Sequence, residues 1–594
     1  MNVRAGESAD PTDRPRFSIL TAVYETVPEH LAECLSSVDS QTETSWEHLV
    51  VDDASTRTDL AEVFAAHDDE RRRVVRRTHN GGIVAASNDA LAMATGEYVV
   101  LLDHDDVLEA NALEAFARAI DGEPGATAGY DRIVWPATGR AVPVRDPDAR
   151  VDVLYSDHDL LRPDGRRATP LYKPIFSLER LRNHNYITHL VCARRELVEE
   201  VGGFTPGLDG AQDHDLLLRL AEVASPFTHV PELLLHWRQS PDSVAADPDN
   251  KPYAFDAGVT AVQQHLDRVG IDAAVSLGPW PGIVTIDREV AARPTVSVVI
   301  PTRGTVGRVW GATRCFVHEA VRSILDAAAD AGDDGTAGDA RDDASGVSRP
   351  GGVELEIVVV LDAESDPMVA AGLRRIAGDR LVLVHHDEPF NFSVKCNRGV
   401  DAASGEYVLL LNDDTELIEP RSIERMVGIA QQDDVGLVGA RLLYEDGRLQ
   451  HAGHWYHGTI HHLFNGFDGE TPGPYGMLAV ERECAGVTAA AALARRATYR
   501  ALGGMDPAFG ANYNDVDLSR RMREAGQRIV YTPRACWYHF EQQSFDHPIA
   551  DAEKALLEER YGHMSLYDPY AHPLLTPGRI DHLELPHHSG APPI

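Results

Sequence analysis

Short runs of apolar residues recur along the chain, and several of them end in a polar or acidic residue. In the first half they cover residues 17–24, 48–53 and 96–102, and in the second half residues 296–301, 355–362 and 405–411. Helical patterns separate the runs, which predicts βαβ units and a parallel sheet in each half. Ligands of open α/β sheets bind beyond the carboxyl ends of the strands, so the polar residues there are the first candidates for a functional site.

The two halves carry this pattern in the same order. The segment GEYVVLL at 96–102 returns as GEYVLLL at 405–411, and an acidic cluster follows each. The glycine pair 202–203 returns at 503–504. Three further pairs and their spacings are Asp105 and Asp414 at 309 residues, Asp213 and Asp515 at 302, and His236 and His539 at 303. Ordered matches at nearly one spacing indicate a duplicated domain.

The length of 594 residues also exceeds what one hydrophobic core usually supports. With the repeat, it predicts two α/β domains at 16–280 and 281–570, a disordered tail at 1–15 and a C-terminal tail at 571–594. The expected boundary lies near 278–294, where the segment GPWPG interrupts the periodic pattern. Residues 326–352 are rich in Asp, Ala and Gly and lack periodicity, which predicts a flexible surface insertion.

Composition excludes several classes of protein. Acidic residues outnumber basic ones 93 to 55, giving a formal charge of −38. This balance argues against nucleic-acid binding through a basic face and against a polybasic membrane anchor. The start of the chain lacks an apolar signal segment, and no apolar stretch approaches the length of a membrane span. Six widely spaced cysteines fit reduced thiols, so we expect a cytoplasmic protein.

The acidic clusters predict a cation site in each half. Asp103 and Asp105 follow one apolar run, and Asn412 and Asp414 follow its repeat. Two oxygen ligands at such a place can hold a hard cation that also binds phosphate oxygens. An isolated Asp-x-Asp is more often a solvated turn, but its recurrence at the same place favours the metal site.

Asp213 and Asp515 each begin a stretch with a helical pattern. Such an aspartate can cap the helix, pair with an arginine or act as a general base. His236 and His539 follow apolar runs farther along, and a lone histidine beside tryptophan is more often structural than a ligand. Together with the acidic clusters, each histidine is interpreted as a third ligand, because neutral imidazole binds Mn²⁺.

These residues resemble those of family 2 glycosyltransferases with the GT-A fold, and the resemblance covers about residues 16–570. In the first half it rests on Ala22-Val23-Tyr24, Val51-Asp52-Asp53-Ala54-Ser55, Asn80-Gly81-Gly82, Leu102-Asp103-His104-Asp105-Asp106, Gln212-Asp213-His214-Asp215-Leu216 and His236-Trp237-Arg238. In the second half it rests on Ile300-Pro301-Thr302-Arg303, Phe390-Asn391-Phe392-Ser393, Leu411-Asn412-Asp413-Asp414, Gly503-Gly504-Met505-Asp506, Asn514-Asp515-Val516-Asp517-Leu518 and His539. The linker resembles that of two-domain enzymes that build rhamnose- or galactose-containing bacterial surface polysaccharides.

The resemblance implies two tandem GT-A domains, Rossmann-like in their sheets, and an inverting, metal-dependent transfer from a UDP- or dTDP-sugar. The acceptor is expected to be a glycan or lipid-linked glycan, with peripheral association at the inner face of the plasma membrane. The implied bases are Asp213 and Asp515. The implied nucleotide-sugar contacts are Ala22, Tyr24, Asp53, Asp103, Thr302, Asp362 and Asn391. The implied ligands of Mn²⁺ or Mg²⁺ are Asp103, Asp105, His236, Asn412, Asp414 and His539. No oligomeric state is indicated.

Some residues depart from the family pattern. Asn412 brings no charge to the second cluster, and Gln212 and Asn514 replace the glutamate that many members have before the base. Five histidines between 451 and 462 suggest zinc, but their spacing fits no standard ligand pattern. In the family this region is an acceptor-side loop.

Three alternatives to a bifunctional enzyme stay open. One domain, more readily the second, can be a non-catalytic carbohydrate-binding or assembly module. The whole chain can be a nucleotide-binding scaffold that turns over no donor. A nucleotidyltransferase would have a Gly-rich, basic phosphate loop after the first strand, and residues 24–28 do not form one. No GxGxxG motif follows the first strand either, which argues against a nicotinamide-dependent Rossmann enzyme.

Overall fold

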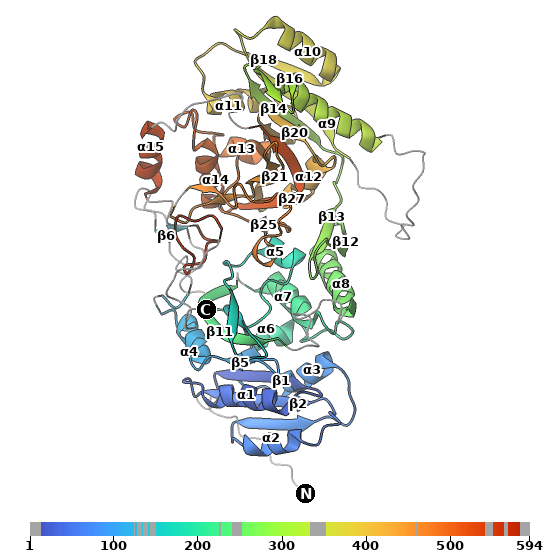
Figure 1. Cartoon of the computed structure of the whole chain (residues 1–594), viewed down its shortest axis with the longest axis vertical. Helices are drawn as coiled ribbons and strands as arrows, with labels where there is room; N and C mark the ends of the chain where they lie inside the picture. The colour runs from blue at the N-terminus through green and yellow to red at the C-terminus, as the bar shows by residue number, and fades with distance from the viewer. Residues whose placement is uncertain are drawn as a thin grey trace.

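The computed structural model shows two α/β domains stacked along the long axis of the molecule (Figure 1). The residues it describes are 14–123, 125–127, 133–134, 141–142, 150–224, 227–239, 252–332, 352–458, 460–540, 551–562 and 568–581. The predicted N-terminal tail therefore lies almost wholly outside the described residues. No helix within these ranges is both long and apolar enough to cross a membrane.

The first domain is built on a mixed sheet in the order β3-β2-β1-β4-β10-β8-β11-β5, with β9 paired to β8. Strands β1 to β4 are parallel, and β10 runs antiparallel to β4 and β8. The strands are β1 (Phe17–Val23), β2 (Trp46–Asp52), β3 (Arg72–Arg76), β4 (Tyr98–Leu101), β5 (Val107–Leu108), β8 (Val153–Leu161), β9 (Arg167–Leu171), β10 (Val191–Arg194) and β11 (Thr228–Arg238).

The second domain repeats this topology in the order β18-β17-β14-β19-β26-β21-β27-β20, with β22 and β25 added at β21 and β27. The strands are β14 (Thr295–Thr302), β17 (Glu354–Asp362), β18 (Leu381–His386), β19 (Tyr407–Leu411), β20 (Thr415–Leu417), β21 (Val435–Leu443), β22 (Leu449–His451), β25 (Arg482–Glu483), β26 (Ala491–Arg495) and β27 (Arg528–His539). The predicted α/β class and the duplication are confirmed.

Helices cover both faces of each sheet, and small two-stranded sheets decorate them. The helices are α1 (Pro28–Asp39), α2 (Leu60–Ala66), α3 (Ile83–Met93), α4 (Ala112–Ile120), α5 (Leu178–Asn183), α6 (Arg195–Glu200), α7 (Gln212–Val223), α8 (Pro252–Arg268), α9 (Phe316–Gly332), α10 (Pro367–Ala377), α11 (Phe392–Ala402), α12 (Ser422–Ala430), α13 (Arg496–Ala501), α14 (Asn514–Glu524) and α15 (Asp551–Tyr561). The small sheets pair β6 (Ile133–Val134) with β7 (Ala141–Val142), β12 (Ala273–Leu277) with β13 (Val284–Arg288), β15 (Val306–Val309) with β16 (Ala312–Cys315), and β23 (His454–Trp455) with β24 (His461–His462).

The apolar runs are continuous because the central strands are buried on both faces. In β14, Val296 and Val298 enter the core under one layer of helices, whereas Val299 enters the core under the other. Strand alternation sends successive side chains to opposite layers, so a strand covered on both sides needs apolar residues throughout.

The domain limits differ from the expected ones in three places. The turn at 278–283 lies inside the β12–β13 hairpin, and Val284 and Ile286 pack in the first domain's core, so the boundary lies beyond β13. The expected insertion begins as helix, because α9 continues to Gly332, and residues 333–351 lie outside the described residues. Part of the expected C-terminal tail is packed, with His572 and Leu575 buried.

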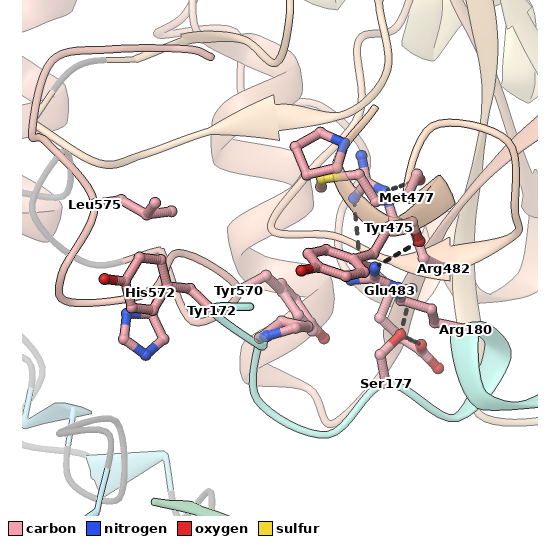
Figure 2. Close-up of a pocket in the computed structure, with 12 residues that line it drawn as sticks. Tyr172, Ser177, Arg180, Tyr475, Met477, Arg482, Glu483, Tyr570, His572 and Leu575 are labelled. Atoms are coloured by element: carbon pink, nitrogen blue, oxygen red, sulfur yellow. Dashed lines mark hydrogen bonds between the residues drawn. The ribbon is translucent and has the colours of Figure 1, made fainter. Parts of the chain in front are cut away.

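Charged residues at the junction tie the two domains together. Arg288 at the end of β13 reaches Glu481 of the second domain at 2.5 Å and Glu179 of α5 at 2.6 Å. Arg528 of the second domain lies 3.2 Å from Glu179 and 2.7 Å from Glu483. Figure 2 shows a pocket beside this cluster, which residues of both domains and of the C-terminal segment line.

Candidate active sites at the strand ends of both domains

In the second domain, the strand ends bring the predicted metal ligands together. Asn412 and Asp414 follow β19, and β20 holds Thr415 opposite His539, the last residue of β27. The Nε2 atom of His539 lies 3.3 Å from Asp414 Oδ1 and 3.1 Å from Asn412 Nδ2. Asp414 is 5% exposed, so its carboxylate is largely shielded from solvent.

Gln450 on β22 sets the orientation of the His539 ring. Its Oε1 accepts a hydrogen bond from His539 Nδ1 at 2.6 Å, and its Nε2 donates to the His539 carbonyl at 3.2 Å. With the proton on Nδ1, His539 Nε2 accepts a hydrogen bond from Asn412 Nδ2 and lies close to Asp414. The Oδ1 atom of Asn412 is buried without a hydrogen-bond partner. Carboxylate, imidazole and an unpartnered amide oxygen form a donor set that fits a divalent cation such as Mn²⁺.

The predicted base Asp515 stands in the first turn of α14. The amides of Val516 and Ala489 donate to its carboxylate at 2.8 and 3.3 Å, and His454 Nε2 lies 3.7 Å away. The side chain stays 19% exposed, so it can meet a substrate hydroxyl. By contrast, Asp517 two residues later is fully buried and pairs with arginines, which is a structural role.

Three strand ends of the second domain meet at the predicted nucleotide contacts. Thr302 Oγ1 donates to Asp413 Oδ2 at 2.5 Å. Lys395 of α11 donates to Asp362 Oδ1 at 2.7 Å and to the Thr302 carbonyl at 2.9 Å. Lys395 is almost fully buried. The local sequence pattern does not predict its position at this site, because its partners lie on β14 and β17.

Asn391, also predicted as a nucleotide contact, has its polar groups engaged by the fold. Its Oδ1 caps α11 by accepting from Val394 N–H at 3.0 Å, and its Nδ2 donates to the Pro507 carbonyl at 2.8 Å. A helix cap of this kind explains the asparagine without a ligand.

The acidic cluster of the first domain is arranged differently. Asp103 is about half-exposed and its Oδ2 lies 3.9 Å from His189 Nε2, while Asp105 lies 3.8 Å from His104. Asp106 is fully buried, accepts from Arg238 N–H at 2.9 Å, and leaves Oδ2 without a partner. Burial and the two neighbouring aspartates raise the pKa of Asp106 well above its usual value.

His236 does not take the place of His539. Its Nδ1 donates to Asp159 at 2.6 Å and its Nε2 lies 3.2 Å from Glu109. On β11, His236 pairs with Val107 of β5. At the spacing of 309 that relates Asp105 to Asp414, Val107 corresponds to Glu416 of β20. Glu416 pairs with Tyr538 of β27, so His236 corresponds to Tyr538.

Trp237 is therefore the counterpart of His539. A shift of one residue turns a strand side chain to the opposite face of the sheet. The structure thus places the His236 ring at Asp159 and Glu109, and its role as a metal ligand stays a prediction.

The other predicted residues of the first domain lie at the ends of β1 and β2 and at α7. Ala22 is half-buried in β1, and Tyr24 just beyond it is 47% exposed. The Asp53 carboxylate accepts from Gly81 and Gly82 N–H at 2.9 and 2.8 Å and from Arg77 at 2.7 Å. It thus organises the loop before α3.

The base candidate Asp213 lies in the first turn of α7. Its Oδ2 accepts from Asn185 Nδ2 at 2.9 Å, so a neutral amide holds it where backbone amides hold Asp515.

Three of the five clustered histidines, His451, His454 and His462, lie close together, and His454 is the one 3.7 Å from Asp515. Thr488 N–H donates to His451 Nε2 at 3.2 Å, which leaves the His451 proton on Nδ1 to donate to His462 Nδ1 at 3.0 Å. These hydrogen bonds engage ring nitrogens of His451 and His462. Burial and the neighbouring histidine lower the pKa of His462 to about 3, so the ring is neutral.

Comparisons with known proteins give a family for both halves of the chain. The family model described as glycosyl transferase family 2 matches residues 18–202, and one described as glycosyltransferase like family 2 matches residues 343–552. An uncharacterized protein, y4gI, of Sinorhizobium fredii is 34% identical over 93% of this chain and 56% of its own length. The O-antigen biosynthesis protein RfbC of Myxococcus xanthus is 31% identical over 89% of this chain and 38% of its own.

The chain thus spans about half or less of the length of these two relatives. Among solved structures, S. aureus TarS residues 1–349 with UDP-GlcNAc is 18% identical. That match covers 42% of this chain and 66% of the other, with a TM-score of 0.32.

Proposed function

The chain carries two family 2 glycosyltransferase domains in tandem, and from that premise we propose that it is a bifunctional inverting glycosyltransferase. Each domain transfers a sugar from a UDP- or dTDP-sugar to a growing cell-surface polysaccharide or glycolipid. The observation that carries the proposal is the repeated arrangement of the two sites. In both domains an acidic cluster directly follows the fourth strand in the sheet order, β4 or β19. In both, an aspartate, Asp213 or Asp515, lies in the first turn of the helix that follows the glycine pair.

The base carboxylates take the proton from the attacking acceptor hydroxyl. Asp515 is held by two backbone amides and Asp213 by Asn185, and both groups keep the carboxylate in one orientation. Attack from the face opposite the leaving group inverts the anomeric carbon. Asp103 in the first domain and Asn412, Asp414 and His539 in the second would hold a divalent cation. A cation held there would offset the negative charge of the departing nucleoside diphosphate.

The nucleotide lies across the first two strand ends of each sheet. In the first domain Tyr24 just beyond β1 offers an exposed aromatic side chain, with Ala22 on β1 and Asp53 directly after the end of β2. In the second domain Thr302 and Asp362 line the same edge, and Lys395 joins them. Because the charge of the chain disfavours nucleic acid, and a relative is named for O-antigen biosynthesis, we place its acceptor among surface glycans at the inner membrane face.

Release of nucleoside diphosphate from a panel of UDP- and dTDP-sugars, with a lipid-linked glycan extract and Mn²⁺, tests this proposal. We expect turnover by the wild type and a loss of about 10²–10⁴-fold in the double variant Asp213→Asn, Asp515→Asn. The matched control Asp551→Asn changes a first-turn aspartate of α15 and should keep full activity. If the nucleotide affinity does not depend on Mn²⁺ and no nucleotide sugar is consumed, a nucleotide-binding scaffold is favoured instead.

A further inference from the structure

We propose that the cation of the first domain is held by His189 and Asp106 together with Asp103. Its imidazole ligand then comes from the segment before β10, whereas that of the second domain comes from β27. The inference rests on the proposed function, because it assigns the ligands of the cation that the first domain uses.

The three side chains present their donor atoms to one point. Oxygens of Asp103 and Asp106 and a ring nitrogen of His189 lie within 4.8 Å of one another. Asp106 adds an independent sign of a missing partner, since it is 0% exposed and its Oδ2 has no hydrogen bond. A buried carboxylate oxygen without a partner is costly, and a cation would satisfy it.

The strand register shows that His189 and His539 come from different strand positions in the two domains. Leu101 of β4 pairs with Val191, and its counterpart Leu410 of β19 pairs with Ala492. Counting back two residues, His189 corresponds to Ala490. On the other side of the cluster, Trp237 corresponds to His539.

His189 and His539 therefore lie beside the acidic clusters of their domains, but on opposite sides. The Trp237 ring, at the strand position that corresponds to His539, packs against the His189 ring with centroids 5.3 Å apart.

The backbone of His189 is firmly held. Its carbonyl accepts hydrogen bonds from the buried Lys173 ammonium and from His158 Nδ1, the latter at 3.0 Å. The His158 ring in turn packs edge-on against Trp237. A ligand on a fixed backbone with a packed ring is preorganised for binding.

The chemistry of the set indicates Mn²⁺ or a similar hard divalent ion. Two carboxylates and one neutral imidazole suit such a cation, and the half-exposed side of Asp103 leaves room for diphosphate oxygens and water. Two of the three donors in this set are carboxylates, whereas the set of Asn412, Asp414 and His539 has one.

Electron spin resonance of Mn²⁺ bound to the full chain tests the assignment. The background is Asp414→Ala with His539→Ala, which removes the second site, and Mn²⁺ is added alone and with UDP. The free-Mn²⁺ signal gives the affinity, and the electron spin-echo modulation from ¹⁴N reports a coordinated imidazole. In this background His189→Ala should lose the nitrogen modulation and weaken Mn²⁺ binding at least about 10–100-fold, the loss seen for groups that only support a ligand.

The matched control is His236→Ala, which removes the neighbouring imidazole and should keep both signals. Adding Trp237→His to His189→Ala copies the arrangement of the second domain and should restore the modulation, which separates ligation from folding. If the ¹⁴N modulation is lost in His236→Ala and retained in His189→Ala, this ligand assignment is overturned, while the proposed function is not affected. Absence of Mn²⁺ binding in the background, with UDP present, overturns metal use by the first domain and this site with it.

Discussion

Replacement of Arg288 by alanine should destabilise the junction between the domains. Arg288 is 6% exposed and spans two buried carboxylates, Glu179 at 0% and Glu481 at 2% exposure. Glu179 keeps Arg182 at 2.7 Å and Arg528 at 3.2 Å after the change. Glu481 loses its ion pair across the domain junction.

The cost follows from leaving a buried charge without its partner. Removal of one member of a buried ion pair costs about 3–5 kcal/mol. For a domain of the size seen here, an unfolding entropy of about 0.6 kcal/mol/K converts this into a drop in melting temperature of about 5–8 °C. The exposed pair Arg150–Glu97 has nearly the same distance, 2.6 Å, but side-chain exposures of 49% and 47%. Arg150→Ala should therefore cost only about 0–1 kcal/mol.

Calorimetric unfolding of wild type, Arg288→Ala and Arg150→Ala at several pH values measures this difference. Burial raises the pKa of Glu179, and Arg288 and two other arginines more than offset this, so the net shift is downward. A depressed carboxyl pKa stabilises the fold above the unfolded pKa of about 4.3 and loses that effect as pH falls. The gap between wild type and Arg288→Ala should thus narrow below about pH 4. Equal melting temperatures for the two variants at neutral pH would refute this reasoning.

Three further changes separate structural from functional roles. Asn391→Ala should cost about 1 kcal/mol of unfolding free energy through loss of a helix cap, with UDP affinity by calorimetry unchanged. Gln450→Leu should weaken Mn²⁺ binding by the second domain about 10–100-fold, and Gln450→Glu should preserve it, since either acceptor can orient His539. His572→Ala removes one of two imidazoles from the buried Asp157 carboxylate and should cost about 1–3 kcal/mol in a urea titration.

The sequence was sufficient to predict the two sheets and the strand ends, because both depend on local apolar runs and on a spacing that repeats. It predicted Asp414 and His539 as neighbours, and the structure brings them within 3.3 Å. Lys395 and Gln450 were missed, since each acts through partners far away in the chain. Asp53 shows the same limit, because only the fold reveals that Gly81 and Gly82 use its carboxylate.

The histidine of the first domain shows how one residue of register changes a site. His236 and His539 both lie next to an aromatic residue near the end of a long strand, but their spacing of 303 differs by one from that of Asp213 and Asp515. Trp237 has the same spacing of 302 from His539, a signal that could have identified it. The pairing of β11 with β8 shifts register at two places along the strand, and the apolar pattern of β11 does not predict these shifts.

Linkage analysis of the products made by Asp213→Asn and Asp515→Asn tests the central claim, that each domain has its own active site. The variants are compared separately and mixed, with the same donors and acceptor. We expect each single variant to make product that lacks a different linkage, and the mixture to restore both. If one variant abolishes every transfer while the other changes none, a single catalytic domain accounts for the activity and the claim is contradicted.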